Sequence, residues 1–420
     1  MELLSTKKQR NSNVELLKII AMLMIVFAHQ VDSFSYSGVG GEIVFNLLEP
    51  TTDARFLLLD FISPLGLFGD VIFIACSAFF LIDSNRISVK KIVLLIVTEI
   101  FVMWCEIVVK ASIGDAITTR QILDAVFPTI LQVNWFIGYY IVFYLLHPLF
   151  NYVIRKLDKK GLAIVAAIFA LQCNVILFGM GNIPGAMGAK FLCFISIYFI
   201  VAFYKLYGGR LWESKKFNVI LLVASLAVYV AFRIAMNFIA FKIEYVAPRQ
   251  FGYAHINNPF VVLFALAAIN LATRKPRQVK IINYFSGLTL VVYLVHKHLQ
   301  FASHAHYMEY FLDTYGADSF VWWLLTHTLI ILGITLVLAV LYRHTVYYGV
   351  IALGAWAEKG VYALCEKLKV KRQNRKKATA QTETEDNAYI EPAENVDVNS
   401  SEVKRDEEHS VADDTLNERN

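Results

Sequence analysis

Charged residues are scarce in this chain of 420 residues. Asp, Glu, Lys and Arg make up 17% of it, whereas 57% is hydrophobic, and the mean hydropathy is +0.53. Apolar runs of about 20 residues, the length that crosses a bilayer, recur along the sequence without the polar face of a soluble helix. The shortage of charge therefore excludes a soluble α/β protein and predicts an all-α, polytopic membrane protein.

Cysteine is also sparse, and several common catalytic motifs are absent. The five cysteines show no metal-ligand spacing, and most fall in apolar runs, as small core residues do. The sequence has no GxxxxGKS/T phosphate loop, no GxSxG, no HExxH and no GxGxxG in a strand–helix context. We therefore expect no metal site. The net charge of +5 lies in short loops, so it indicates topology and no nucleic-acid partner.

About ten transmembrane helices are predicted from the apolar runs. They cover residues 14–34, 61–82, 91–110, 134–153, 161–180, 189–207, 217–240, 259–273, 281–301 and 319–342. Lys and Arg concentrate before the first span and in every second loop after it. By the positive-inside rule, both termini are then cytoplasmic, and the first span ends on the outer side of the membrane.

The chain divides into three parts on composition. Residues 1–345 form the transmembrane domain. Residues 346–379 are apolar with a few charges and then strongly basic, which predicts an interfacial amphipathic helix and a juxtamembrane anchor on anionic lipid, in preference to an eleventh span. Residues 380–420 are acidic and polar, which is typical of a disordered tail.

The first span carries three ionisable groups, Glu15, Lys18 and His29. Eleven positions turn a helix by about 1100°, only about 20° past three full turns, so Lys18 and His29 share one stripe about 16 Å apart along the axis. Charged groups inside a span normally face a bundle interior or a wet cavity. A simple alternative is a headgroup ion pair of Glu15 with Lys18 and an interfacial His29.

Other spans also contain polar or aromatic candidates for substrate binding. They are Asp70 in the second span, Trp135 and Tyr139 in the fourth, Arg233 in the seventh, and Tyr293 and His296 in the ninth. Each has a structural alternative: aromatic residues at an interface, a snorkelling arginine or a histidine near the membrane surface. The third span adds Glu99 and Glu106, which lie on one face because they are seven residues apart.

In combination, these segments resemble the acyltransferase family 3 membrane proteins, which O-acylate extracytoplasmic glycans. The family begins with an acidic-x-x-basic element, and ten residues separate its basic residue from a histidine, as in Glu15-Leu16-Leu17-Lys18 and His29. Three further segments match its second, fourth and ninth helices: Phe73 to Phe79, Trp135-Phe136 with Tyr144 to Leu149, and Thr289 with Tyr293-Leu294-x-His296. The resemblance covers about residues 10–345. Lys18 often is arginine in the family, and Ser77-Ala78 replaces a Ser-Gly pair.

The resemblance implies an enzyme of the plasma membrane. It would transfer an acyl group, expected to be acetyl, from cytoplasmic acyl-CoA to a hydroxyl of a cell-surface polysaccharide or other glycan. His29 would act as general base, with an acyl-histidine intermediate also possible. Lys18 would hold donor charge or stabilise developing negative charge, and Glu15 would orient it. The sequence leaves open whether a partner transferase finishes the transfer.

Two other classes of function also fit the sequence. A polysaccharide exporter or flippase would use the same polar intramembrane cavity without chemistry. A membrane sensor or scaffold would act through the tail at residues 380–420. A histidine on the stripe of the first span favours the enzyme, because transport requires no base there.

Overall fold

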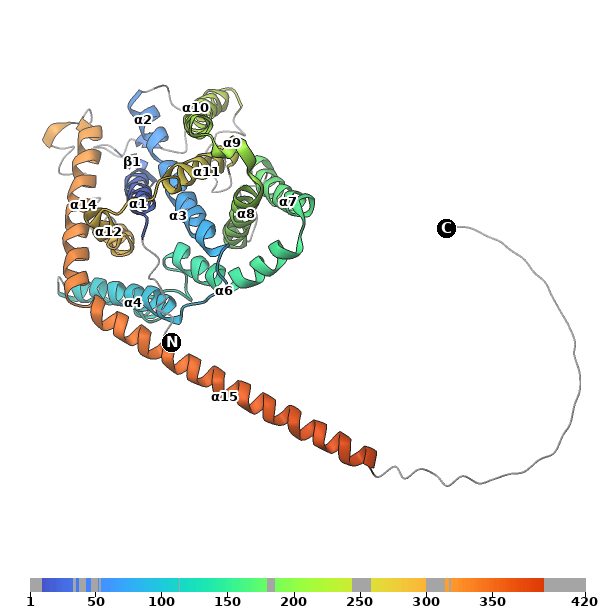
Figure 1. Ribbon diagram of the computed structural model, residues 1–420. Helices are drawn as coiled ribbons and strands as arrows, with labels where there is room; N and C mark the ends of the chain where they lie inside the picture. The colour runs from blue at the N-terminus through green and yellow to red at the C-terminus, as the bar shows by residue number, and fades with distance from the viewer. Residues whose placement is uncertain are drawn as a thin grey trace, which may run out of the picture. The chain divides into compact units, whose positions relative to one another are not determined.

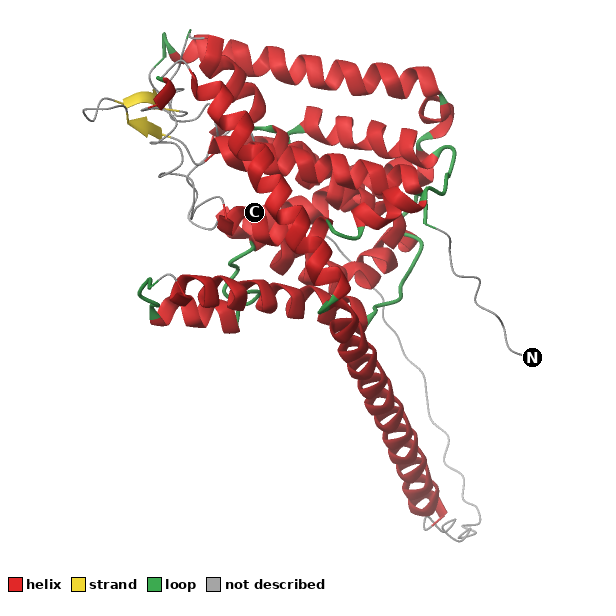
Figure 2. Ribbon diagram, turned by 90° about the vertical axis from the view of Figure 1, so that its left-hand side faces the viewer, coloured by secondary structure: helices red, strands yellow, loops and turns green. Residues whose placement is uncertain are grey.

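The computed structural model is helical apart from one small hairpin. It describes residues 10–32, 35–37, 43–46, 52, 54–112, 114–179, 186–243, 258–299, 314–316 and 319–388. In the hairpin, β1 (Ser35–Ser37) pairs antiparallel with β2 (Ile43–Asn46), drawn in yellow in Figure 2. The helical class predicted from the sequence is therefore confirmed. The chain divides into residues 1–360 and 361–420, and the functional site lies in the first unit.

Helices lie at each predicted span. They are α1 (Ser12–Asp32), α2 (Ala54–Ile62), α3 (Leu65–Leu81), α4 (Val89–Ser112), α5 (Thr119–Val126), α6 (Trp135–Lys156), α7 (Lys159–Gly179), α8 (Ala186–Tyr207), α9 (Gly209–Glu213), α10 (Lys215–Ala240), α11 (Pro259–Thr273), α12 (Lys280–Ser286), a helix over residues 289–299, α14 (Phe320–His344) and α15 (Tyr347–Ala388).

Six helices of the described chain are long and apolar enough to cross a membrane: α1, α4, α6, α8, α10 and α14. Two others, α3 and α11, are apolar but have only 17 and 15 residues. The chain thus has the helices of a multi-pass membrane protein. The count of ten spans and the cytoplasmic position of the termini remain predictions.

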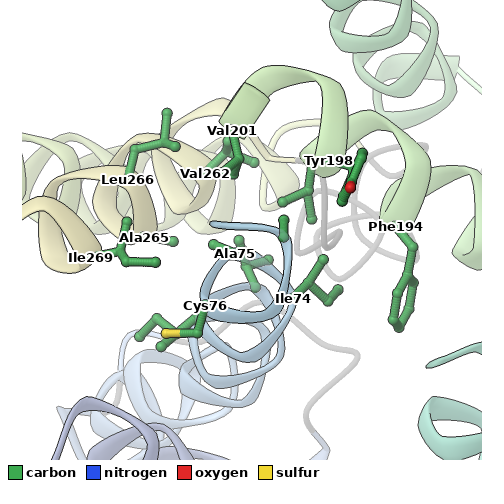
Figure 3. Packing of buried hydrophobic residues seen from close by; sticks show 14 of the residues in the cluster. Ile74, Ala75, Cys76, Phe194, Tyr198, Val201, Val262, Ala265, Leu266 and Ile269 are labelled. Atoms are coloured by element: carbon green, nitrogen blue, oxygen red, sulfur yellow. The ribbon is translucent and has the colours of Figure 1, made fainter. Parts of the chain in front are cut away.

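Helix α1 is the element around which the first unit packs. It contacts α3, α11, α12 and α14, and Figure 1 draws it among these helices. Its approach to α3 is close at Gly69, where a Cβ would lie 2.5 Å from the carbonyl oxygen of Ala21 and 2.6 Å from Cγ1 of Ile25. Only a residue without a side chain fits there. On its far side, α3 packs with α8 and α11 in an apolar cluster that includes Ala75, Val201 and Leu266 (Figure 3).

The ninth predicted span is interrupted in the structure. Helix α12 ends at Ser286, a turn follows at Gly287 and Leu288, and the helix resumes over residues 289–299. The prediction of one continuous helix over residues 281–301 is wrong at this turn, and residues 300 and 301 lie outside the described residues. The apolar pattern concealed the break, because Gly287 and Leu288 interrupt the backbone without adding any charge.

Helix α15 begins within the first unit. There Ser88 Oγ donates a hydrogen bond to Glu358 Oε1 at 3.0 Å, and Gly354 faces the backbone of Lys90. The helix extends through the predicted interfacial and basic segment to Ala388, past residue 380, where the tail is predicted to begin. Residues 389–420 of that predicted tail lie outside the described residues.

Candidate active site

Glu15 and Lys18 form an ion pair in the first two turns of α1. Lys18 Nζ lies 2.8 Å from Glu15 Oε2, and the hydroxyl of Ser286 donates a hydrogen bond to the same carboxylate oxygen. Ser286 is the last residue of α12, so the interrupted helix supplies this donor. Glu15 is 9% exposed, and Lys18 lines the cavity described below. The pair faces the helix bundle.

A cavity of about 370 Å³ lies beside this ion pair. Three cationic side chains line it, Arg10, Lys18 and Lys91, together with the carboxylate of Asp70. The rest of its wall is mostly apolar or aromatic: Met22, Ile25, Phe73, Ser77, Leu94, Leu95, Thr98, Phe136, Ile137, Tyr140, Gly287, Thr289, Leu290, Val291, Tyr293, Tyr342 and Tyr347. Such a cavity suits a ligand with an anionic end and a long apolar part.

Lys91 is held in place by two tyrosines of α6. Its Nζ donates a hydrogen bond to the hydroxyl of Tyr140 at 2.6 Å and lies 4.4 Å from the ring centroid of Tyr144. On another part of the wall, the hydroxyls of Thr98 and Tyr342 lie 2.7 Å apart and are buried. These contacts connect α4, α6 and α14 around the cavity, and those of Lys91 fix the position of its ammonium group.

His29 and His296 lie in direct contact. Nδ1 of His29 is 2.9 Å from Nε2 of His296, and the two rings are nearly parallel, with 9° between their planes. Nδ1 of His296 lies 3.0 Å from the carbonyl oxygen of Val292. A carbonyl only accepts, so Nδ1 of His296 carries the proton and donates it. In the neutral pair, Nε2 of His296 then accepts from Nδ1–H of His29, and Nε2 of His29 is the basic nitrogen.

Tyr293 connects the cavity with this histidine pair. Its ring lines the cavity, and its centroid lies 5.9 Å from that of His296. On α1, Ile25 lines the cavity one turn before His29. The structure therefore brings together six predicted site residues: Glu15, Lys18, His29, Asp70, Tyr293 and His296.

Three predicted substrate-binding residues lie apart from the cavity wall. Trp135 and Tyr139 face α8, where Lys190 Nζ lies 4.5 Å from the Trp135 ring centroid and the Tyr139 ring packs 6.1 Å from that of Phe191. Arg233 is 5% exposed and lines a separate pocket of about 120 Å³ with Tyr229 and residues of α2.

The two carboxylates of α4 have different hydrogen-bond and ion-pair partners. Glu99 accepts from Thr129 and Asn134, whereas Glu106 pairs with His298 and Lys110.

The site residues predicted from the sequence did not include Ser286, Lys91 or His327 of α14, which makes a second histidine contact. Nδ1 of His327 lies 2.7 Å from Oε1 of Gln30, the residue after His29, and both side chains are buried. The signal for His327 was present, since a histidine within an apolar span is costly and marks a polar contact. Ser286 and Lys91 carried no such signal, because both stand at helix ends.

Within the described part of the chain, no group of three His, Cys, Asp or Glu side chains could hold a metal ion.

Comparison with known families agrees with this geometry. The model of the acyltransferase family 3 domain matches residues 11–344, from the residue before α1 to the last residue of α14. No curated protein and no solved structure matches the chain. The matched segment contains the ion pair, the histidine pair and all the residues that line the cavity except Arg10 and Tyr347, and it covers most of the sequence. The chain therefore belongs to acyltransferase family 3.

Proposed function

We propose that this protein is a membrane O-acyltransferase that moves an acyl group, expected to be acetyl, from cytoplasmic acyl-CoA to a hydroxyl of a cell-surface polysaccharide or other glycan. The family match supports acyl transfer. One observation carries the rest: a cavity with cationic groups near Lys18 extends along α1 to Tyr293, which contacts the histidine pair. Acyl-CoA has the matching form, with phosphates at one end and a thioester at the other.

In this proposal the donor and the acceptor meet at His29. The acceptor hydroxyl attacks the thioester carbonyl while Nε2 of His29 takes its proton, which suits an imidazole near neutral pH. The tetrahedral intermediate collapses to the new ester, and the thiolate of CoA leaves and receives a proton. His296 fixes the tautomer of His29, as an orienting group does in a catalytic triad. Lys18 and Lys91 hold donor phosphates, and Glu15 orients Lys18.

A polysaccharide exporter or flippase is the second candidate. The interruption at Gly287 favours it, because helices that break beside a cavity are a feature of transporters. The two candidates differ in the fate of the glycan. Without an acyltransferase the glycan reaches the cell surface lacking acyl groups, whereas without an exporter it accumulates inside the cell.

Mass spectrometry of surface glycans from cells with and without the gene tests the proposal. Complementation with His29→Asn sharpens it, since the Asn amide keeps a donor toward His296 but has no basic nitrogen. We expect this variant to lose about 10²- to 10⁴-fold in acyl transfer, as removal of a general base typically does. Normal acylation with His29→Asn at wild-type protein levels would show that His29 is not the base.

A further inference from the structure

Two lysines carry positive charge near the histidine pair, and neither of them lines the cavity. Lys190 belongs to α8, and Lys297 follows His296 directly in the helix over residues 289–299. The two lysines are close enough for their charges to repel, and the charge of Lys297 also acts on His29 and His296. Both lysine side chains are partly buried. This pair of cations therefore stands next to the proposed reaction centre.

Neither lysine has a carboxylate partner among the residues that the structure describes. Other lysines of the unit do, since Lys18, Lys110 and Lys205 each lie within 2.8 Å of a carboxylate oxygen. Two partly buried like charges without a counter-ion destabilise a fold. Such an arrangement persists where a bound anion relieves the repulsion, which makes it a candidate binding site.

The surroundings of the two lysines suit a polar ligand. Lys190 Nζ lies over the ring of Trp135, which keeps the ammonium group at a fixed position. The hydroxyl of Tyr139, one turn further along α6, is buried and has no hydrogen-bond partner in the described structure. An unmade hydrogen bond at a buried hydroxyl costs free energy, so this group too has the character of a ligand contact.

We infer that Lys190 and Lys297 bind an anionic group, a carboxylate or a phosphate, of the glycan acceptor. This inference rests on the proposed function. The donor phosphates have their own cations at Lys18, which lies about 16 Å from His29 along α1. Lys190 and Lys297 lie at the opposite end, beside His29, where the acceptor hydroxyl must arrive. The acceptor is thus an acidic glycan, positioned by its charge for attack on the thioester.

The test measures transfer by the full-length protein in proteoliposomes, with acetyl-CoA and with the surface glycan of cells that lack the gene. We expect Lys190→Gln and Lys297→Gln each to raise the KM for the glycan about 10- to 100-fold, the worth of one charged hydrogen bond. The KM for acetyl-CoA should stay unchanged. Lys190→Arg and Lys297→Arg should retain most of the affinity for the glycan, since they keep the charge. Arg120→Gln serves as control, because Arg120 is an exposed cation already paired with Asp124.

Three results would overturn the inference while leaving acyl transfer intact. They are a neutral acylated repeat unit in the glycan, an unchanged glycan KM in both glutamine variants, or an increased KM for acetyl-CoA instead, which would assign the lysines to donor phosphates. Absence of transfer by the wild-type protein, with no acyl group lost from cells without the gene, is a different result. It removes the proposed function and this inference with it.

Discussion

The chemistry proposed for His29 depends on the position of one proton. Because the Val292 carbonyl accepts from Nδ1 of His296, the neutral pair directs the basic nitrogen of His29 away from His296. If His296 is replaced by a residue that cannot accept a hydrogen bond from Nδ1–H of His29, either ring nitrogen of His29 can carry the proton. The imidazole base itself remains. The contribution of His296 is therefore orientation, and it should be smaller than that of His29.

The variant His296→Asn measures this contribution. Its amide can still donate to the Val292 carbonyl, but the ring nitrogen that accepts from His29 is gone. We expect a partial loss of acyl transfer, smaller than the about 10²- to 10⁴-fold loss in His29→Asn. The readout is acylated glycan per unit of membrane protein. A loss as large as that of His29→Asn would assign His296 a direct chemical role, and no loss would show that the contact is only packing.

The ion pair of Lys18 with Glu15 contributes to the stability of the fold and, in the proposed function, to donor binding. Mutation can separate these two contributions. Lys18→Met leaves a largely buried carboxylate with only the Ser286 hydroxyl, so we expect a fall in both stability and activity. The double variant Glu15→Gln with Lys18→Met removes the unpaired charge and should recover the thermal stability of the purified protein, but not its activity. Lys18→Arg should be the mildest change, since it keeps the charge on the same stripe. Recovery of activity in the double variant would contradict a role of Lys18 in donor binding.

The sequence predicted the part of the site that follows from spacing along one helix. A separation of eleven positions places Lys18 and His29 on one face of a helix, whatever the rest of the fold does. The sequence could not predict that Ser286 contacts Glu15 or that Lys190 lies near enough to Lys297 for their charges to interact, because these pairs come from helices far apart in the chain. The sequence singled out Trp135 and Tyr139 as candidates, but their direction, toward α8 and away from the cavity, depends on the rotation of α6.

At the scale of elements, the site depends on how closely α1 and α3 approach. The cavity lies between Lys18 and Ile25 of α1 and Asp70 of α3, and Gly69 allows these backbones to meet. The sequence predicted both helices but neither their separation nor the interruption of α12 at Gly287. Hydropathy reports whether a segment is apolar, and it carries little information on backbone breaks or on interhelical distance.

Gly69→Ala tests this close approach. Its Cβ would overlap the carbonyl oxygen of Ala21 and Cγ1 of Ile25, so the two helices must separate. We expect a destabilisation of about 1–3 kcal/mol, as for overpacking in other cores, and a loss of acyl transfer. Gly333→Ala in α14 is the matched control, because a Cβ there has open space around it. A lower melting temperature in the control, or an unchanged one in Gly69→Ala, would contradict this account of the packing.

At the scale of the whole molecule, the proposed reaction requires a defined orientation in the membrane. Acyl-CoA is made inside the cell and the glycan lies outside, so Lys18 must face the cytoplasmic side and His29 the outer side. The charge distribution of the loops agrees with this orientation, since Lys and Arg gather in the segments on the side of Lys18. Helix α4 provides a way to test it, because it runs from Lys90 and Lys91 at one end to an exposed loop at Asp115.

Cysteine labelling in intact cells checks the orientation. Cys105, Cys173 and Cys365 are first replaced by serine, while Cys76 and Cys193 are buried. We expect Asp115→Cys to react with a membrane-impermeant maleimide in intact cells. Lys160→Cys, exposed at the start of α7, should react only after the membrane is opened. The reverse pattern would place the Lys18 end of the cavity outside, where no acyl-CoA reaches it, and the proposed direction of transfer would then be wrong.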